Sequence, residues 1–234
     1  MDIKIYAGTV NQYYTDDWIL NEDDKESLKI VKVTSKIENN DNHYIQEMVA
    51  NWEKQILQSI SNIKNNNYPS WSEIRSDYLT ARFIQEAYSA LIMYSASLIY
   101  HLPFPEIIKS DTSLENHDLV QMALNDEKYN WSLFNGTTCW LPINEQLTFY
   151  GPNPTGQTLV IATTGTLLNE LKHINHLGWN GNERSIINWY KFKKNQDEKS
   201  GLYNTEFLAK QAFSILYQTV AFANKNNVPI LLSY

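Results

Sequence analysis

Cysteine is almost absent from this chain of 234 residues, since Cys139 is the only one. A single thiol can form no disulfide within the chain and no site that needs two thiolates, and this usage is typical of a reducing cytoplasm. Positive charge is also scarce, because 19 basic residues stand against 26 acidic ones and the formal net charge is −7. We therefore expect no direct nucleic-acid binding, which needs a basic surface to match the phosphate backbone.

Long apolar runs are missing as well. The best candidate, residues 87–100, is interrupted by three serines, and a bilayer crossing needs about 20 apolar residues. This run therefore predicts a buried helix and no membrane contact. Asp2 and Lys4 interrupt the beginning of the chain, where a secretory signal needs an unbroken apolar stretch, so the expected location is the cytoplasm.

The sequence shows no internal division. No stretch rich in proline, glycine or serine separates two halves, and no repeat is visible. The simplest organisation is one globular domain over residues 1–234, in which residues 1–42 form a strand and loop subregion. Helical spacing dominates the pattern of apolar residues, so we predict an α+β fold dominated by helix, with a small antiparallel sheet.

The clearest helix is predicted for residues 43–64, where seven apolar residues fall at steps of three and four. After a breaker at residues 65–69, Ser70 and Glu73 have capping-box spacing and predict a second helix that runs to about residue 100. Further helices are predicted at residues 115–125, 167–174, 183–194 and 205–224, and strands at residues 3–6, 29–33, 139–141, 147–150, 158–163 and 229–232.

Residues 151–158 (GPNPTGQT) nearly match a phosphate-binding loop, but Gln157 stands where that motif has its lysine. The motif needs the lysine to reach the phosphates and a following helix whose first amides point at them. The next residues here favour a strand. This segment therefore predicts a hairpin connection and no nucleotide site.

A candidate metal site rests on Glu170, His173 and His176, which follow one another at one-turn spacing. The Glu-x-x-His pair is used by di-iron helical bundles, which need a second such pair, and no second pair occurs in the chain. The favoured interpretation is a solvated helix edge, and an enzyme with a metal at these residues stays as the alternative. We expect no cofactor and assign no catalytic residue, because no known nucleophile or metalloprotease motif is present.

Cys139 is the remaining candidate for chemistry. It can act as a nucleophile only beside a base that generates its thiolate. Its neighbours Trp140 and Leu141 favour a buried, inert thiol.

Aromatic residues are abundant, with seven tryptophans and 15 tyrosines. Trp52 lies on the apolar stripe of its helix, so we expect it in the core. Trp18, Trp71, Trp131 and Trp179 have polar or turn-like neighbours. Such rings either bind a partner at an exposed surface or cover the core beneath loops, and the sequence leaves both interpretations open.

Acidic charge gathers in two segments that each contain one of these tryptophans. Residues 1–42 hold nine acidic and five basic residues, and residues 111–150 hold six acidic residues and one basic residue. Carboxylates can steer a basic protein partner that indole rings then hold, whereas an ordinary charge run is only a solvated face. The predicted partner-binding residues are Asp16, Asp17, Trp18, Glu22, Asp23 and Asp24 in the first segment, and Asp111, Glu115, Asp118, Asp126, Glu127 and Trp131 in the second.

Residues 149–151 and 159–164, followed by LLNELKHIN at residues 167–175, resemble a pattern seen in bacterial immunity proteins of polymorphic toxin systems. The resemblance implies a cytoplasmic protein that binds one cognate toxin and blocks it without chemistry. Many such toxins are basic nucleases, which suits the acidic segments. The preferred hypothesis is therefore a non-catalytic, toxin-neutralising protein. The metal enzyme and a small-ligand or peptide binder with exposed aromatic rings are the alternatives.

Overall fold

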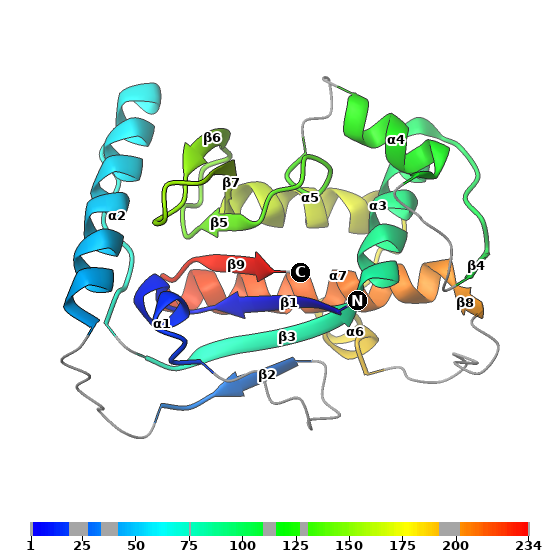
Figure 1. Cartoon of the computed structure of the whole chain (residues 1–234). Helices are drawn as coiled ribbons and strands as arrows, with labels where there is room; N and C mark the ends of the chain where they lie inside the picture. The colour runs from blue at the N-terminus through cyan, green and yellow to red at the C-terminus, as the bar shows by residue number, and fades with distance from the viewer. Residues whose placement is uncertain are drawn as a thin grey trace.

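The described residues form a main sheet of seven strands, with helices on both of its faces (Figure 1). This computed structural model describes residues 2–18, 28–33, 42–74, 76–109, 116–126, 131–191 and 202–233. In spatial order the strands are β2 (Leu28–Val31), β3 (Tyr78–Ile84), β1 (Asp2–Ala7), β9 (Ile230–Ser233), β5 (Cys139–Leu141), β7 (Thr158–Thr163) and β6 (Thr148–Pro152). A separate two-stranded sheet joins β4 (Ile107–Lys109) to β8 (Leu202–Asn204).

Helix is the more abundant regular structure, as expected for the predicted α+β class. The helices are α1 (Val10–Tyr14), α2 (His43–Lys64), α3 (Gln85–Tyr100), α4 (Asp118–Asn125), α5 (Thr164–Leu177), α6 (Glu183–Trp189) and α7 (Thr205–Asn226). No helix within the described ranges is long and apolar enough to cross a membrane.

The prediction of a small antiparallel sheet is wrong in size, and its strand direction is right for all pairs of the main sheet but one. Strands β1 and β9, from the two ends of the described chain, pair at the centre of the sheet, and local sequence patterns carry no information about such distant pairing. All strand pairs in the main sheet are antiparallel except β5 and β7. That pair is parallel because β6 lies between the two strands in sequence and turns back in a hairpin with β7.

The predicted helix over residues 70–100 is also wrong in its first part. Strand β3 occupies Tyr78–Ile84, and helix α3 begins only at Gln85. Leu79, Ala81 and Phe83 alternate along this strand and are buried against the larger core, a period of two that is typical of a strand. The other predicted helices and strands are present in the described residues, with boundaries shifted by a few positions.

The sheet separates two hydrophobic cores. The larger core lies between one sheet face and helices α3, α5 and α7, and it includes Ile5 and Trp140. The smaller core lies on the other face beneath α1 and α2, and it includes Tyr6, Trp52 and Ile161. Helix α2 stands at one end of the sheet beside the β6–β7 hairpin (Figure 1). The functional site described next lies at this end.

Candidate functional site

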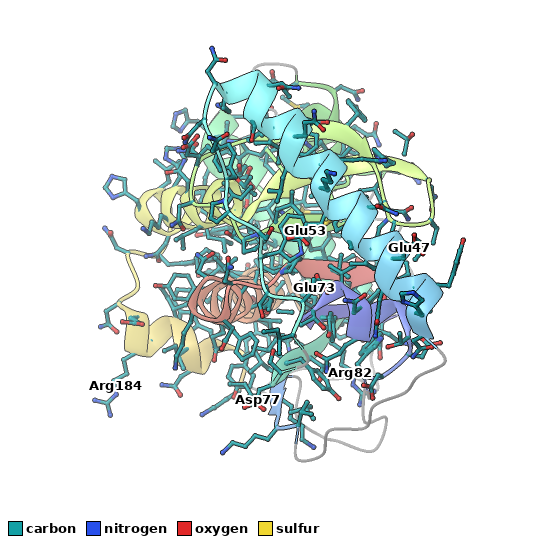
Figure 2. All side chains as sticks on the ribbon, turned by 90° about the vertical axis from the view of Figure 1, so that its left-hand side faces the viewer. Glu47, Glu53, Glu73, Asp77, Arg82 and Arg184 are labelled. Carbon is teal, nitrogen blue, oxygen red and sulfur yellow. The ribbon has the colours of Figure 1, made fainter. Side chains whose placement is uncertain are left out.

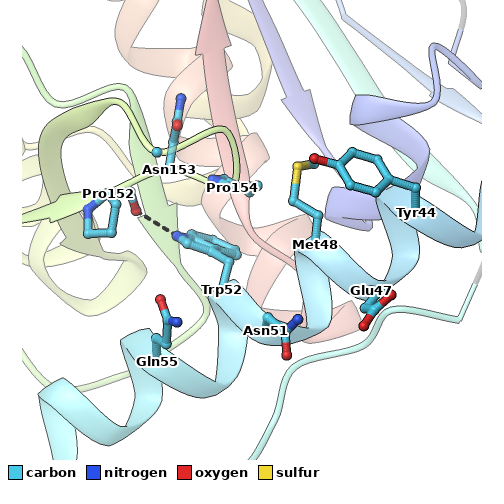
Figure 3. A pocket seen from close by; sticks show the side chains of 10 residues that line it. Tyr44, Glu47, Met48, Asn51, Trp52, Gln55, Pro152, Asn153 and Pro154 are labelled. Carbon is cyan, nitrogen blue, oxygen red and sulfur yellow. Dashed lines mark hydrogen bonds between the residues drawn. The ribbon is translucent and has the colours of Figure 1, made fainter.

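Two cavities adjoin one another where α2, α1 and the turn between β6 and β7 meet. The outer cavity has a volume of about 430 Å³ and lies between α2 and the turn (Figure 3). The inner cavity has a volume of about 590 Å³ and extends from α1 to strands β7 and β9. Both are lined by Trp52, Asn153 and Pro154, so we describe them together as the hairpin cleft. Their volumes lie in the range of known ligand sites.

Trp52 joins the helix to the hairpin. Its position on the apolar stripe of α2 buries the ring in the smaller core, where it packs against Trp71 with ring centroids 5.4 Å apart. The indole Nε1 donates a hydrogen bond of 2.6 Å to the carbonyl oxygen of Pro152 (Figure 3). Gly151 allows this close approach, because a Cβ there would lie 3.3 Å from Cδ1 of Ile56 on α2.

The turn between β6 and β7 is held by its own hydrogen bonds. The side-chain oxygen of Asn153 accepts hydrogen bonds from the backbone amides of Thr155 and Gln157. Gly156 has a positive φ of 86°, which glycine adopts without strain. The segment that nearly matched a phosphate loop is therefore the predicted hairpin connection, and its prolines form a rigid wall of the cleft.

Polar side chains line the outer cavity in a row along α2. Glu47, Asn51 and Gln55 are each four residues apart and so share one helix face (Figure 3). Tyr44, one turn earlier, is 77% exposed. This face offers a ligand one carboxylate and two carboxamides, which together can donate and accept hydrogen bonds.

The inner cavity is aromatic. Its walls include Tyr13 and Tyr14 of α1, Trp52 of α2 and Tyr150 of β6, whose side chain is 79% exposed. Burial raises the pKa of the Tyr14 hydroxyl above its ordinary value. This phenol therefore stays neutral, and the walls of the cavity are suited to apolar and ring contacts.

Cys139 lines the inner cavity but is buried, as the sequence predicted. Burial raises the pKa of its thiol from 9.0 to about 12. We expect Ellman's reagent in mildly alkaline buffer to modify the folded protein about a thousandfold more slowly than the unfolded one, because only the thiolate reacts. Equal rates in native buffer and in guanidinium chloride would contradict this expectation.

Few of the described residues that line the cleft carry groups that commonly transfer protons or act as nucleophiles. Among its described lining residues, Glu47 is the one carboxylate, and no histidine, lysine, arginine or aspartate is present. The Cys139 thiol has no base among these residues that could generate its thiolate. General acid–base catalysis needs a donor and an acceptor within reach of the substrate.

The described part of the first acidic segment lies beside the cleft. Asp16, Asp17 and Trp18 directly follow α1, and the half-buried Trp18 ring stacks on Tyr13 of the cleft wall with centroids 5.5 Å apart. Trp18 also contacts the Tyr6 ring, with centroids 5.2 Å apart. Glu22, Asp23 and Asp24 lie outside the described residues.

The second acidic segment lies on the other face of the sheet. Trp131 packs against the larger core, where it stacks on Phe134 and meets the edge of His173. Asp126 accepts a hydrogen bond from the Tyr100 hydroxyl, and Asp118 is exposed at the start of α4. Asp111, Glu115 and Glu127 lie outside the described residues. The structure therefore does not bring the two predicted segments together on one surface.

Trp18 and Trp131 are both half-buried, so each covers the edge of a core and still exposes part of its ring. Trp71 is buried and Trp179 packs between other aromatic rings. For these four tryptophans, covering the core is the common role.

Glu170 does not face a metal site with the two histidines. Its carboxylate is buried and accepts hydrogen bonds from the Ser132 amide at 2.6 Å, the Ser132 hydroxyl at 2.8 Å and the Leu133 amide at 3.2 Å. His173 and His176 are exposed on the outer side of α5. Within the described ranges, no group of three or more histidine, cysteine, aspartate or glutamate residues is placed to hold a metal ion.

Two half-buried carboxylates lie close together, Glu53 on α2 and Glu73 in the segment between α2 and β3 (Figure 2). Glu73 accepts hydrogen bonds from the amides of Val10 and Asn11 and from the Trp71 indole, and Glu53 accepts one from the Trp71 amide. Burial raises the pKa of both carboxyl groups. The predicted capping box at Ser70 and Glu73 is therefore wrong, since no helix begins there, and Glu73 instead accepts hydrogen bonds from the first amides of α1, which is distant in sequence.

The hairpin cleft itself was missed by the sequence analysis. The sequence predicts a strand at Tyr150 and a hairpin connection at Asn153 and the prolines of the turn, but nothing in the local sequence shows that α2 lies beside them. Comparison of the chain with family models, curated proteins and solved structures found no match.

Proposed function

We propose that this protein is a non-catalytic binding protein and that the hairpin cleft takes up a segment of a protein partner. The observation that carries the proposal is the make-up of the cleft. Aromatic rings and carboxamides line it together, and among its described lining residues no acid–base pair and no nucleophile beside a base is present. Exposed aromatic rings beside hydrogen-bonding groups are typical of the residues that dominate protein interfaces.

Charge favours a basic partner. The chain has a formal net charge of −7, Glu47 lines the cleft, and Asp16 and Asp17 follow the helix that forms one wall. Acidic groups around a binding site accelerate the encounter with a positively charged protein. Neutralisation of a basic toxin, as the resemblance to bacterial immunity proteins implies, is the role that we propose for this binding.

The acidic surface at Asp118, Asp126 and Trp131 is not part of the contact surface that we propose. It lies on the sheet face opposite to the smaller core. A partner seated in the cleft therefore meets Asp16 and Asp17 first, and we assign the contact surface to that side of the molecule.

Co-expression with the reading frames that flank its gene tests the proposed function. We expect one product to be toxic alone, to form a complex with this protein and to be neutralised by it. Tyr44→Ala and Tyr150→Ala should each weaken that complex about tenfold, because exposed aromatic residues at interfaces commonly contribute more than 1 kcal/mol. Both side chains are more than three-quarters exposed, so neither change should unfold the protein.

Ile74→Ala is the matched control, because Ile74 is 81% exposed and does not line the cleft. It should leave the affinity unchanged. Absence of any complex and of any rescue from toxicity would refute the proposed function. If both tyrosine variants bind as tightly as the original protein, the partner contacts a surface other than the cleft.

A further inference from the structure

The inner cavity lies where the main sheet is incomplete. Strand β7 runs over Thr158–Thr163, but β5 pairs only with its last three residues, from Ile161 onwards. Residues 158–160 have β6 on one side and no described strand on the other. The cavity occupies this place, with residues 158–160 on one wall and Leu231 and Leu232 of β9 on another. We call this gap in the sheet beside residues 158–160 the notch.

The backbone of β7 points its hydrogen-bonding groups into the notch. The Asn153 amide donates a hydrogen bond of 2.8 Å to the Gln157 carbonyl, so these two residues form a hydrogen-bonded pair. Because such pairs alternate along an antiparallel ladder, the next pair, Pro152 and Thr158, is not hydrogen-bonded across the ladder. The same alternation applies to Tyr150 and Val160. The amide and carbonyl groups of Thr158 and the amide of Val160 therefore point away from β6 and into the notch. The carbonyl of Val160 also points away from β6, but it faces β5, where the parallel pairing of Cys139 with Ile161 uses it.

The carbonyl of Pro152 supports this assignment. It is the partner of Thr158 in the ladder register, and it accepts its hydrogen bond from the Trp52 indole on α2. The alternation requires the carbonyl of Pro152 to point away from β7. By the same rule, the backbone amide and carbonyl of Thr158 point away from β6.

We propose that the notch receives an extended segment of the partner, which pairs its backbone with residues 158–160 and continues the main sheet beside β7. This inference rests on the proposed function and specifies its mode of recognition. An unpaired strand edge pairs with an extended peptide through main-chain hydrogen bonds, and neighbouring pockets then select alternate side chains. Here Tyr14, Trp52 and Tyr150 supply the walls of such pockets.

The lining of the cleft specifies the side chains of that segment. No cationic side chain occurs among the described lining residues, and Glu47 contributes a negative charge. Apolar or aromatic residues fit the inner walls, and an arginine or lysine fits beside Glu47. Backbone groups that point to one side at every second residue match the hydrogen-bonding period of an extended peptide.

Selection from a random decapeptide library displayed on phage provides the probe. We expect enriched peptides that carry apolar residues at alternate positions and at least one basic residue. In the complex with the unaltered protein, the amides of Thr158 and Val160 should become protected from hydrogen exchange. Methylation of the peptide backbone at alternate amides should lower its affinity about tenfold, with a period of two residues, because each methyl group removes a main-chain donor.

Two variants of Thr158 distinguish the contribution of its backbone amide to the affinity from that of its side chain. Thr158 is exposed and is the first residue of β7, a position where proline is tolerated in a strand. Thr158→Pro removes the amide donor and should lower the affinity about tenfold, whereas Thr158→Ala keeps the donor and should bind within twofold of the original protein. Circular dichroism of both variants verifies the fold, and the methylated peptides test the same bonds without altering the protein.

The outcomes distinguish this inference from the proposed function. Peptides that protect only amides of α2, or that show no period of two on methylation, would overturn strand addition and leave binding in the cleft intact. The absence of any enriched peptide, or protection of the same amides by a disaccharide such as chitobiose, would also overturn it. Co-expression with the flanking genes decides the proposed function independently.

Discussion

Replacement of Trp52 by alanine should lower the free energy of unfolding by about 3–5 kcal/mol, the usual cost of removing a buried aromatic side chain. Trp52 is 4% exposed, packs on Trp71 and donates the hydrogen bond that joins α2 to Pro152 in the hairpin. Its removal leaves a cavity between the two halves of the cleft, and the carbonyl of Pro152 loses its indole donor. Urea denaturation followed by circular dichroism measures the loss.

Two other substitutions on α2 serve as references for Trp52→Ala. Trp52→Phe keeps an aromatic ring in the smaller core but loses the indole donor, and it should cost about 1–2 kcal/mol. Gln58→Ala changes an exposed position on the same helix and should stay within about 0.5 kcal/mol of the original protein. A loss below about 1 kcal/mol for Trp52→Ala would show that the helix and the hairpin are held together by other contacts.

Glu170→Ala should lower the free energy of unfolding by about 2–4 kcal/mol at neutral pH. The change removes the acceptor for the backbone amides of Ser132 and Leu133, which are buried at the start of a tight turn. A buried amide without a partner costs about 1–3 kcal/mol. Lys172→Ala, at an exposed position of the same helix, should change the stability by less than about 0.5 kcal/mol.

The same carboxyl group makes stability depend on pH. Burial raises the pKa of Glu170 from its ordinary value of 4.5 to about 7, although three hydrogen bonds favour the charged form. The folded protein therefore binds the proton more tightly than the unfolded chain does. Between about pH 4.5 and pH 7 the contribution of this group should fall as pH rises, by about 3 kcal/mol in total.

Glu170→Gln tests the pH dependence, because glutamine cannot titrate. The slope of stability against pH between these two values should become smaller in the variant than in the original protein. An unchanged slope would assign the pH dependence to other groups, of which Glu53 and Glu73 also have a raised pKa. A metal site at Glu170, His173 and His176 would instead produce a melting temperature that rises on addition of zinc or manganese.

Much of the secondary structure could be predicted from the sequence, because the pattern of apolar residues in each segment records which side of it is buried. Helix α2 and the hairpin of β6 and β7 are present as predicted. Strand β3 was missed because it runs directly into the apolar helix α3, without a breaker between them. A capping spacing at Ser70 and Glu73 then favoured one long helix.

The candidate site could be predicted much less well. The acidic segments were visible in the sequence, yet only the segment with Asp16, Asp17 and Trp18 lies beside the cleft. The second segment is on the other sheet face, because Trp131 packs with Phe134 against the larger core. Charge along a chain does not record which side of a sheet each segment reaches.

The sequence alone determined the class of fold, the burial of Trp52 and Cys139, and the hairpin at residues 151–158, since each follows from local spacing or local turn chemistry. Only the tertiary structure decided that β1 and β9 pair, that Glu73 caps α1, and that α2 lies against the hairpin. These contacts join residues that are far apart in the chain. They form because strands and helices with buried faces must share one interior, and the gap in the sheet beside Thr158 is a result of how those elements meet.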